Sequence, residues 1–146
     1  MTPAFSWHIG LFDRMLNSAY SGLAEENVTS GGRTWALLVA GTNGWSYYRH
    51  QANICHAYKT LVNKFNMPKD RIITMFYDDV ANDGRNPRPG ELINEPNGTD
   101  VYKGVVKDYT GEVTFFTNFI IEYTFMHKYV QGNRRHSKLR RDYLLI

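Results

Sequence analysis

Two polar clusters in this sequence contain side chains that could bind a ligand, and each directly follows a short apolar run. The first runs from Asn43 to His50 and the second begins with Asp78-Asp79. In the first, Arg49 offers a rigid fork of donors for a carboxylate or an amide oxygen, or else merely begins a solvated helix. Paired carboxylates can bind Mg²⁺ or share a proton, although an Asp after a strand more often accepts backbone hydrogen bonds.

The elements around these clusters are those of a βαβ unit. The apolar runs 34–40 and 71–77 are predicted to be strands. Between them, apolar residues recur at three- and four-residue steps, which predicts a helix from about Tyr48 that ends before Pro68. Ligands of open α/β sheets bind at the carboxyl ends of the strands. Both polar clusters therefore fall where a pocket is expected.

The single cysteine, Cys55, falls on the apolar side of this predicted helix. A buried cysteine is usually inert, whereas a nucleophile needs an exposed, electropositive setting and a partner histidine. The adjacent His56 cannot serve, because neighbouring helical residues point in different directions. We expect Cys55 to be structural, and one cysteine excludes an intrachain disulfide.

The remainder of the chain divides by composition. Residues 1–33 are predicted to be poorly structured, 34–125 to form a partial domain, and 126–146 to be a divergent basic tail. The whole chain has a net charge of +3, whereas the tail from Met126 holds six basic residues and one acid. The tail could bind anionic surfaces, or be a solvated end. Residues 78–111 are rich in Asp, Asn, Gly and Pro and predict a long loop, and a further helix is expected from Thr114 to Glu122.

Several classes of protein are not supported by the composition. No segment approaches the roughly 18 apolar residues of a membrane span, and the N-terminus lacks the features of a clear signal peptide. We expect no metal, no cofactor and no nucleic-acid partner, and the oligomeric state stays open. The sequons at Asn27 and Asn97 matter only if the chain is secreted.

Seven segments of the chain follow one another in a specific order: WALLVAGTNGW (35–45), YRHQA (48–52), CHAY (55–58), ITMFYDDVA (73–81), NPRPG (86–90), PNGTDVY (96–102) and KDYTGE (107–112). Taken in order, they resemble the opening of the legumain (asparaginyl endopeptidase) family. The catalytic subunit of GPI transamidase shares the Tyr-Arg-His and Asp-Asp-x-Ala elements but matches less well. The resemblance implies an α/β fold, a caspase-like three-layer sandwich around a parallel sheet, here incomplete, and a lysosomal or vacuolar location.

The resemblance also implies a function. Members of the family cleave peptides or proteins after Asn through a Cys nucleophile and a His base. By carry-over, Arg49 would contact the substrate side chain with His50 beside it, and Asn43, Tyr47, Asp78 and Asp79 would lie at the pocket edge.

The sequence departs from the family at its catalytic residues. The Asp-His-Gly and Glu-Ala-Cys-Glu motifs do not occur, and Tyr47 replaces an Asn that orients the catalytic His in the family. We therefore expect a fragment that is inactive alone, or a pseudoenzyme that binds peptides. A truncated gene model, a frameshift or a splice variant would explain the abrupt change of charge at the tail.

Overall fold

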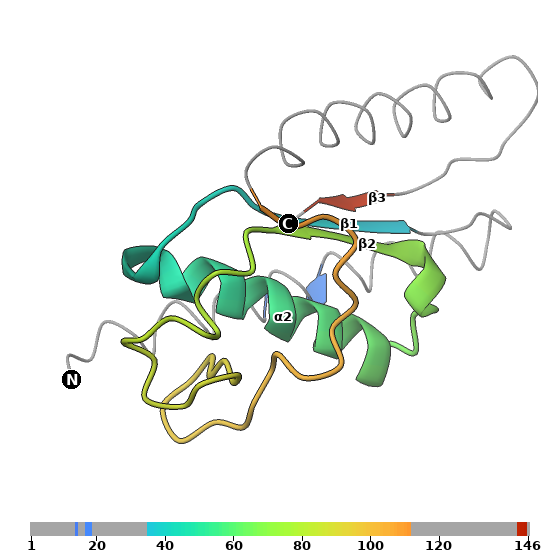
Figure 1. Ribbon diagram of the computed structural model, residues 1–146. Coiled ribbons are helices and arrows are strands. Elements are labelled where there is room, and N and C mark those ends of the chain that lie inside the picture. Colours follow the sequence, from blue (N-terminus) through green and yellow to red (C-terminus); the bar gives the residue numbers. More distant parts are fainter. Residues whose placement is uncertain (1–13, 15–16, 19–34, 112–142, 146) are drawn as a thin grey trace, which may run out of the picture.

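The computed structural model describes residues 35–111, the backbone of 143–145, and three residues nearer the N-terminus, Arg14, Asn17 and Ser18. Three strands and one long helix make up its regular structure (Figure 1). The elements in chain order are β1 (Trp35–Ala40), η1 (Trp45–Tyr47), α2 (Tyr48–Asn63), η2 (Lys69–Arg71), β2 (Ile72–Phe76) and β3 (Tyr143–Leu145). No helix of the described residues is long and apolar enough to cross a membrane.

The three strands form one parallel sheet in the order β2-β1-β3. β1 lies in the centre, and it pairs with β2 from Ala36↔Ile72 to Ala40↔Phe76. β3 pairs only with the first half of β1, from Trp35 to Leu37. The predicted βαβ unit is therefore confirmed, and a third strand joins it from the far end of the chain.

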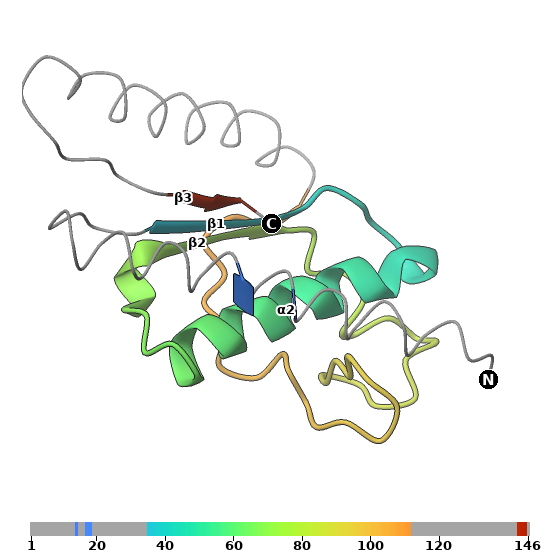
Figure 2. The same cartoon turned by 180° about the vertical axis from the view of Figure 1, so that it is seen from behind.

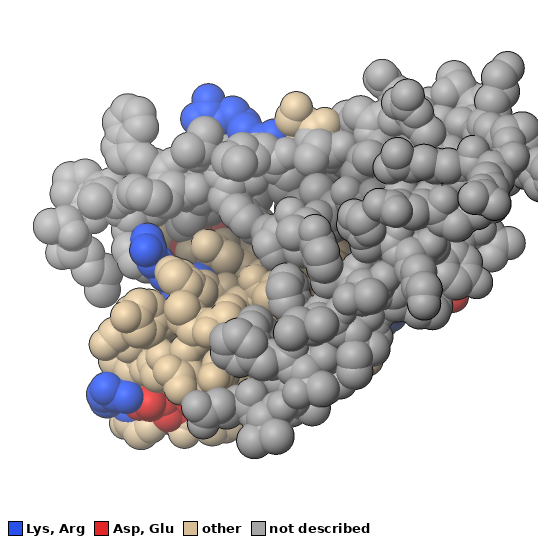
Figure 3. Space-filling view, turned by 90° about the horizontal axis from the view of Figure 1, so that it is seen from above, with Lys and Arg blue, Asp and Glu red and all other residues tan. Residues whose placement is uncertain are grey.

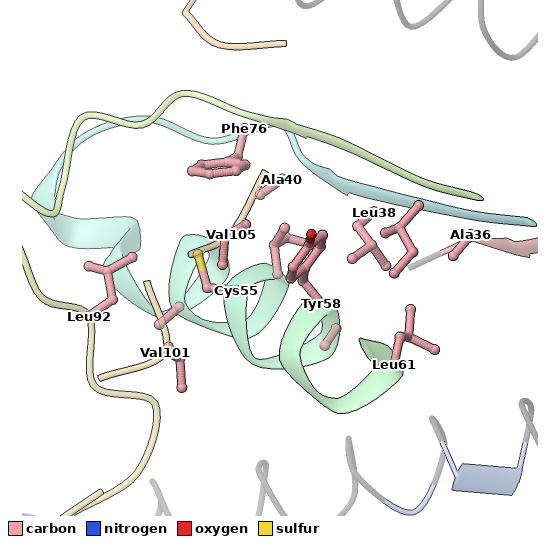
Figure 4. Close-up of a cluster of buried hydrophobic side chains, with 14 of the residues drawn as sticks. Ala36, Leu38, Ala40, Cys55, Tyr58, Leu61, Phe76, Leu92, Val101 and Val105 are labelled. Atoms are coloured by element: carbon pink, nitrogen blue, oxygen red, sulfur yellow. The ribbon is translucent and has the colours of Figure 1, made fainter. Parts of the chain in front are cut away.

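The helix α2 covers one face of the sheet, and its buried side is wide (Figures 1 and 2). Alternate residues of β1 point toward it, as the two-residue period of a strand requires. Side chains from the sheet and the helix interdigitate around Tyr58 and Phe76, and both of these are almost fully buried (Figure 4). The apolar cluster includes Ala36, Leu38, Ala40, Ile54, Cys55, Tyr58, Leu61, Ile72 and Phe76.

The long segment after β2 forms an ordered loop that packs on α2, on the side away from the sheet (Figure 1). Leu92, Val101 and Val105 of this loop belong to the same apolar cluster as the helix. The Asp100 carboxylate accepts hydrogen bonds from the backbone of Leu92, Tyr102 and Lys103 at 2.8 to 3.0 Å. Burial opposes the ionisation of Asp100, but these donors outweigh it and lower the pKa of this group. The loop therefore has structure despite its lack of helix or strand.

The loop returns to the outer edge of β2 and closes it. Tyr109 forms a one-residue parallel bridge with Met75, and the backbone of Thr74 and Phe76 bonds to the backbone of Tyr109 at 3.1 and 3.2 Å. The Asp108 carboxylate accepts the Thr74 N–H at 2.9 Å. An exposed strand edge invites pairing with other chains, so these contacts protect β2.

The main difference from the sequence-based expectation is β3. Residues 143–145 fall in the basic tail 126–146, in which the sequence predicts no strand. The structure places this backbone in the sheet. The segment 1–33 lies, apart from three residues, outside the described part of the chain, as does the helix predicted from Thr114 to Glu122.

Candidate functional site

The predicted Arg–His pair lies in the first turn of α2, just beyond the carboxyl end of β1. The chain leaves β1 through Gly41 and turns at Gly44, which has φ 81° and ψ 161°. A non-glycine residue is strained in that region, so glycine permits the turn. The Gly44 carbonyl accepts the Tyr47 N–H at 3.0 Å and begins the short helix that leads into α2. Arg49 is exposed, and no carboxylate within residues 35–111 pairs with its guanidinium.

His50 is held by a hydrogen bond to the end of β1. Its Nδ1 lies 2.9 Å from Thr42 Oγ1, and this bond fixes the plane of the imidazole without using Nε2. The ring centroid of Tyr47 lies 5.7 Å from that of His50, and Tyr47 is 48% exposed. Burial lowers the pKa of His50, and the like charge of Arg49 lowers it further, so the ring is mainly neutral at pH 7. Arg49 and His50 thus form a preformed edge with several donors.

Asp79 hydrogen-bonds to the residues on either side of this edge in the chain. Its Oδ2 accepts the Gly44 N–H at 2.7 Å, and its Oδ1 accepts the Gln51 Nε2–H at 2.5 Å. Gln51 is fully buried in the first turns of α2. One carboxylate therefore joins the loop after β2, the turn after β1 and the helix. Among the predicted pocket-edge residues, Asp79 contacts the turn, and Asn43 is exposed within it.

Asp78 serves a different part of the molecule. Its carboxylate accepts the Tyr102 hydroxyl at 2.7 Å and pairs with Lys107 at 2.9 Å. The ammonium of Lys107 also contacts the Tyr102 hydroxyl and lies over its ring. Asp78 has φ 62°, a conformation that Asp tolerates better than most residues. The two neighbouring carboxylates therefore have separate partners and do not form a shared site.

The described residues contain no group of three or more His, Cys, Asp or Glu side chains that could hold a metal ion. Cys55 is fully buried in the core, as its position on the helix predicts. Burial raises the pKa of its thiol to about 12, and the nearby charge of Asp78 acts in the same direction. A thiol in this state is not a nucleophile at neutral pH.

A polar groove of about 420 Å³ lies elsewhere on the described surface. It runs between the C-terminal half of α2 with its C-cap, from His56 to Lys64, and loop residues from Asn94 to Val101. None of the predicted site residues lines it. Lys59 in this groove donates to the Asp100 carbonyl at 3.0 Å, so part of its polar lining already has partners.

Two residues of the edge were missed in the sequence. The sequence indicates only that Thr42 belongs to a turn. In the structure, its hydroxyl hydrogen-bonds to His50, eight residues later in the chain. Gln51 shares the buried side of α2 with Cys55 and Tyr58. A polar residue at a buried helical position must find a hydrogen-bond partner, and that requirement was the available signal. The partner itself, Asp79, is 28 residues away and depends on the sheet register.

Residues 34–138 match the model of the peptidase C13 family. That range is most of the chain. The chain belongs to the peptidase C13 family. The resemblance read from the sequence is therefore confirmed, and the parallel sheet with its covering helix is part of the caspase-like α/β fold of that family.

Curated relatives agree with this assignment. Legumain of Mus musculus is 47% identical over 116 residues, which are 79% of this chain and 26% of the relative. Legumain of Homo sapiens is 53% identical over 90 residues, covering 62% of this chain and 21% of the relative. The beta-isozyme of vacuolar-processing enzyme from Arabidopsis thaliana is 50% identical over 96 residues, 66% of this chain and 20% of the relative. The chain thus spans about a quarter or less of the length of these relatives.

Proposed function

We propose that this chain supplies the asparagine-recognising edge of a legumain-type cysteine endopeptidase. The observation that carries the proposal is the preformed pair in the first turn of α2, where Arg49 is exposed and His50 is anchored to Thr42. The names of the relatives, legumain and vacuolar-processing enzyme, support proteolytic processing as the setting of this edge. Its partner would be a peptide or protein that contains Asn.

The chemistry of the pair suits a side-chain amide. A guanidinium presents several donors in a rigid plane, and the oxygen of an Asn side chain can accept from it. A neutral imidazole adds either a donor or an acceptor at Nε2. Within this proposal, Arg49 binds the oxygen of the substrate side chain, and His50 lines the same pocket. Asn43 and Tyr47 stand at its rim.

The second part of the proposal is that the 146-residue polypeptide does not cleave peptides by itself. Its sequence holds neither the Asp-His-Gly nor the Glu-Ala-Cys-Glu motif, and the thiol of Cys55 is buried and protonated. A fluorogenic Ala-Ala-Asn substrate tests this, with legumain of Mus musculus as the positive control. No release of the fluorophore above a no-protein blank is expected. Turnover that grows with the concentration of the purified chain would contradict it.

Binding without cleavage is the direct test of the edge. Isothermal calorimetry would compare an Asn-containing peptide with the same peptide carrying Leu at that position. The wild-type chain is expected to bind the Asn peptide more tightly, and Arg49→Ala should reduce that affinity about tenfold, the size of a lost charge-assisted hydrogen bond. Arg71→Ala is the matched control, because Arg71 directly precedes β2, whereas the Arg49–His50 edge lies at the other end of the sheet. Equal weak heats for wild type and Arg49→Ala would end the proposal.

The alternative functions predict other outcomes, each with its own measurement. A pseudoenzyme that only binds peptides would give the same affinities but would remain inactive when joined to a legumain segment bearing the catalytic motifs. A GPI-transamidase-like role would favour peptides with a small residue in place of Asn.

An electrostatic role of residues 126–142 would give binding to anionic vesicles that falls steeply with salt. On the described face in Figure 3, basic side chains stand apart rather than in one patch.

The location proposed for the chain is the lysosome or vacuole. The name of the vacuolar-processing enzymes supports it. Immunofluorescence of the native protein against a lysosomal or vacuolar marker provides the measurement. A diffuse signal that does not overlap the marker would reject this location.

A further inference from the structure

Asp79 has contacts that distinguish it from a residue that meets substrate. Both oxygens of its carboxylate accept hydrogen bonds within the fold, from Gly44 N–H at 2.7 Å and from Gln51 Nε2 at 2.5 Å. Hydrogen bonds to a charged acceptor are stronger than those between neutral groups. The three elements that meet at Asp79 are the loop after β2, the turn after β1 and the buried side of α2. Its oxygens are therefore engaged before any ligand arrives.

The two donors are placed where they control the start of α2. Both backbone polar groups of Gly44 are hydrogen-bonded in the turn. Its N–H donates to Asp79, and its carbonyl accepts the Tyr47 N–H at 3.0 Å. Gln51 lies in the first turn of α2, on its buried side, and so holds the start of the helix from the core. Arg49 lies between these two anchors in the chain. A shift of either anchor would change the direction in which Arg49 and His50 project.

No other group within the helix start performs this task. The N-cap residue of α2, Tyr47, makes no side-chain capping bond, and the first turn of α2 holds no acidic residue. The first turn of a helix has unpaired N–H groups and favours a nearby anion. Asp79 brings a carboxylate to this region from a different strand end. The Thr42 hydroxyl bonds to His50 and so anchors the imidazole itself.

We propose that Asp79 is a positioning residue, which holds Gly44 and Gln51 so that the Arg49–His50 edge is formed before a peptide binds. The identity of the ligand rests on the function proposed above. The two hydrogen bonds that Asp79 accepts from Gly44 and Gln51, which we call the brace, are a property of the fold. Preorganisation of this kind improves affinity because fewer side chains and loops must be ordered on binding. Asp79 therefore acts through Arg49 and His50 and does not contact the peptide.

The conservative variant Asp79→Asn separates positioning from charge. The Asn oxygen can accept the Gly44 N–H, and its NH₂ group can donate to Gln51 Oε1 after the Gln51 amide turns over. Gln51 Oε1 is buried and lacks a hydrogen-bond partner among the described residues, so this rotation would give it one. Asp79→Ala can make neither contact. The two variants therefore differ in the brace and share the loss of the carboxylate charge.

The experiment measures amide hydrogen exchange at Gly44 and affinity for the Asn-containing peptide in the full 146-residue chain. Asp79→Ala is expected to speed Gly44 exchange at least tenfold and to weaken peptide binding about tenfold. Asp79→Asn should stay within about threefold of wild type in both. Asp70→Ala, which removes an exposed acid at the far end of β2, is the matched control and should change neither.

The outcomes separate this inference from the proposed function. Unchanged Gly44 exchange in folded Asp79→Ala overturns the positioning role, as does an Asp79→Asn variant that behaves like Asp79→Ala. If no variant binds the peptide, the wild type included, the proposed function fails and the exchange rates alone decide the brace. If circular dichroism shows that Asp79→Ala does not fold, Gln51→Met replaces it. That variant removes one anchor, so Gly44 exchange should rise at least about fivefold, beyond the threefold range expected of Asp79→Asn, and exchange within about threefold of wild type overturns the inference.

Discussion

Arg49 and His50 are adjacent cationic or potentially cationic side chains, and each influences the other. Burial is the main cause of the lowered pKa of His50, and the charge of Arg49 is the second. Arg49→Ala is therefore expected to raise the pKa of His50, because the imidazolium no longer meets a like charge. A proton NMR titration of the His50 ring measures this, with Arg71→Ala as control. A pKa of His50 that stays at its wild-type value in Arg49→Ala would contradict the coupling.

The same shift affects stability. The folded chain binds the His50 proton more weakly than the unfolded chain does, because the pKa of His50 is lowered on folding. The ordinary pKa of the group is 6.5. The stability that it contributes is therefore present above pH 6.5 and is lost as the pH falls from 6.5 through the lower pKa of the folded chain.

Cys55 is expected to behave as a core residue in solution. Its side chain is fully buried, so a thiol reagent should modify it only as fast as the chain unfolds. Folding raises the pKa of the thiol from 9.0 to about 12, so the stability that it contributes is present below pH 9.0 and is lost as the pH rises toward 12. Labelling with Ellman's reagent in native buffer and in denaturant tests the first point. Rapid labelling of the native chain would show that the thiol is accessible.

Among the elements, the outer edge of β2 is closed by the backbone of Tyr109 and by one side chain, that of Asp108. Asp108 accepts the N–H of Thr74, a fully buried residue, at 2.9 Å. Asp108→Ala would leave this donor without its partner, which should lower the free energy of unfolding by about 1–3 kcal/mol. Chemical denaturation provides the measurement. Asp108→Asn keeps an acceptor and is the control, so an equal loss in both variants would refute the role of the hydrogen bond.

The elements also differ in how well the sequence predicts them. β1, α2 and β2 follow from local patterns, namely two short apolar runs and a helical period between them that ends before Pro68. β3 has three residues, too few for a period, and its partner β1 lies about a hundred positions earlier. The positions of Arg49 and His50 at a strand end were predictable from topology. The brace at Asp79 was not, because Gly44 donates from its backbone and any residue type can do so.

At the scale of the whole molecule, the core has three contributors in layers. The sheet and the long loop lie on opposite sides of α2, and side chains of all three meet in one apolar cluster (Figures 1 and 4). The candidate edge sits at one end of this arrangement, where β1, β2 and α2 converge. Leu92 of the loop packs in this cluster, and the N–H of the next residue, Ile93, donates to the Tyr48 hydroxyl at the start of α2 at 2.6 Å, so the loop is part of the support of the edge. Leu92 is fully buried, and its truncation to Ala falls in the class of changes that cost about 2–5 kcal/mol.

The pairing of β3 with β1 links the far end of the chain to the centre of the sheet, and its removal is a test of the whole arrangement. A chain ending at residue 142 lacks the backbone that pairs with Trp35, Ala36 and Leu37. The freed edge of β1 is expected to lower the melting temperature and to promote association between chains, since unpaired strand edges bind one another. Size-exclusion chromatography over a range of concentrations measures the association, and thermal denaturation measures the melting temperature. A chain ending at residue 145 keeps β3 and is the matched control. If both truncated chains elute and melt alike, β3 does not protect the sheet.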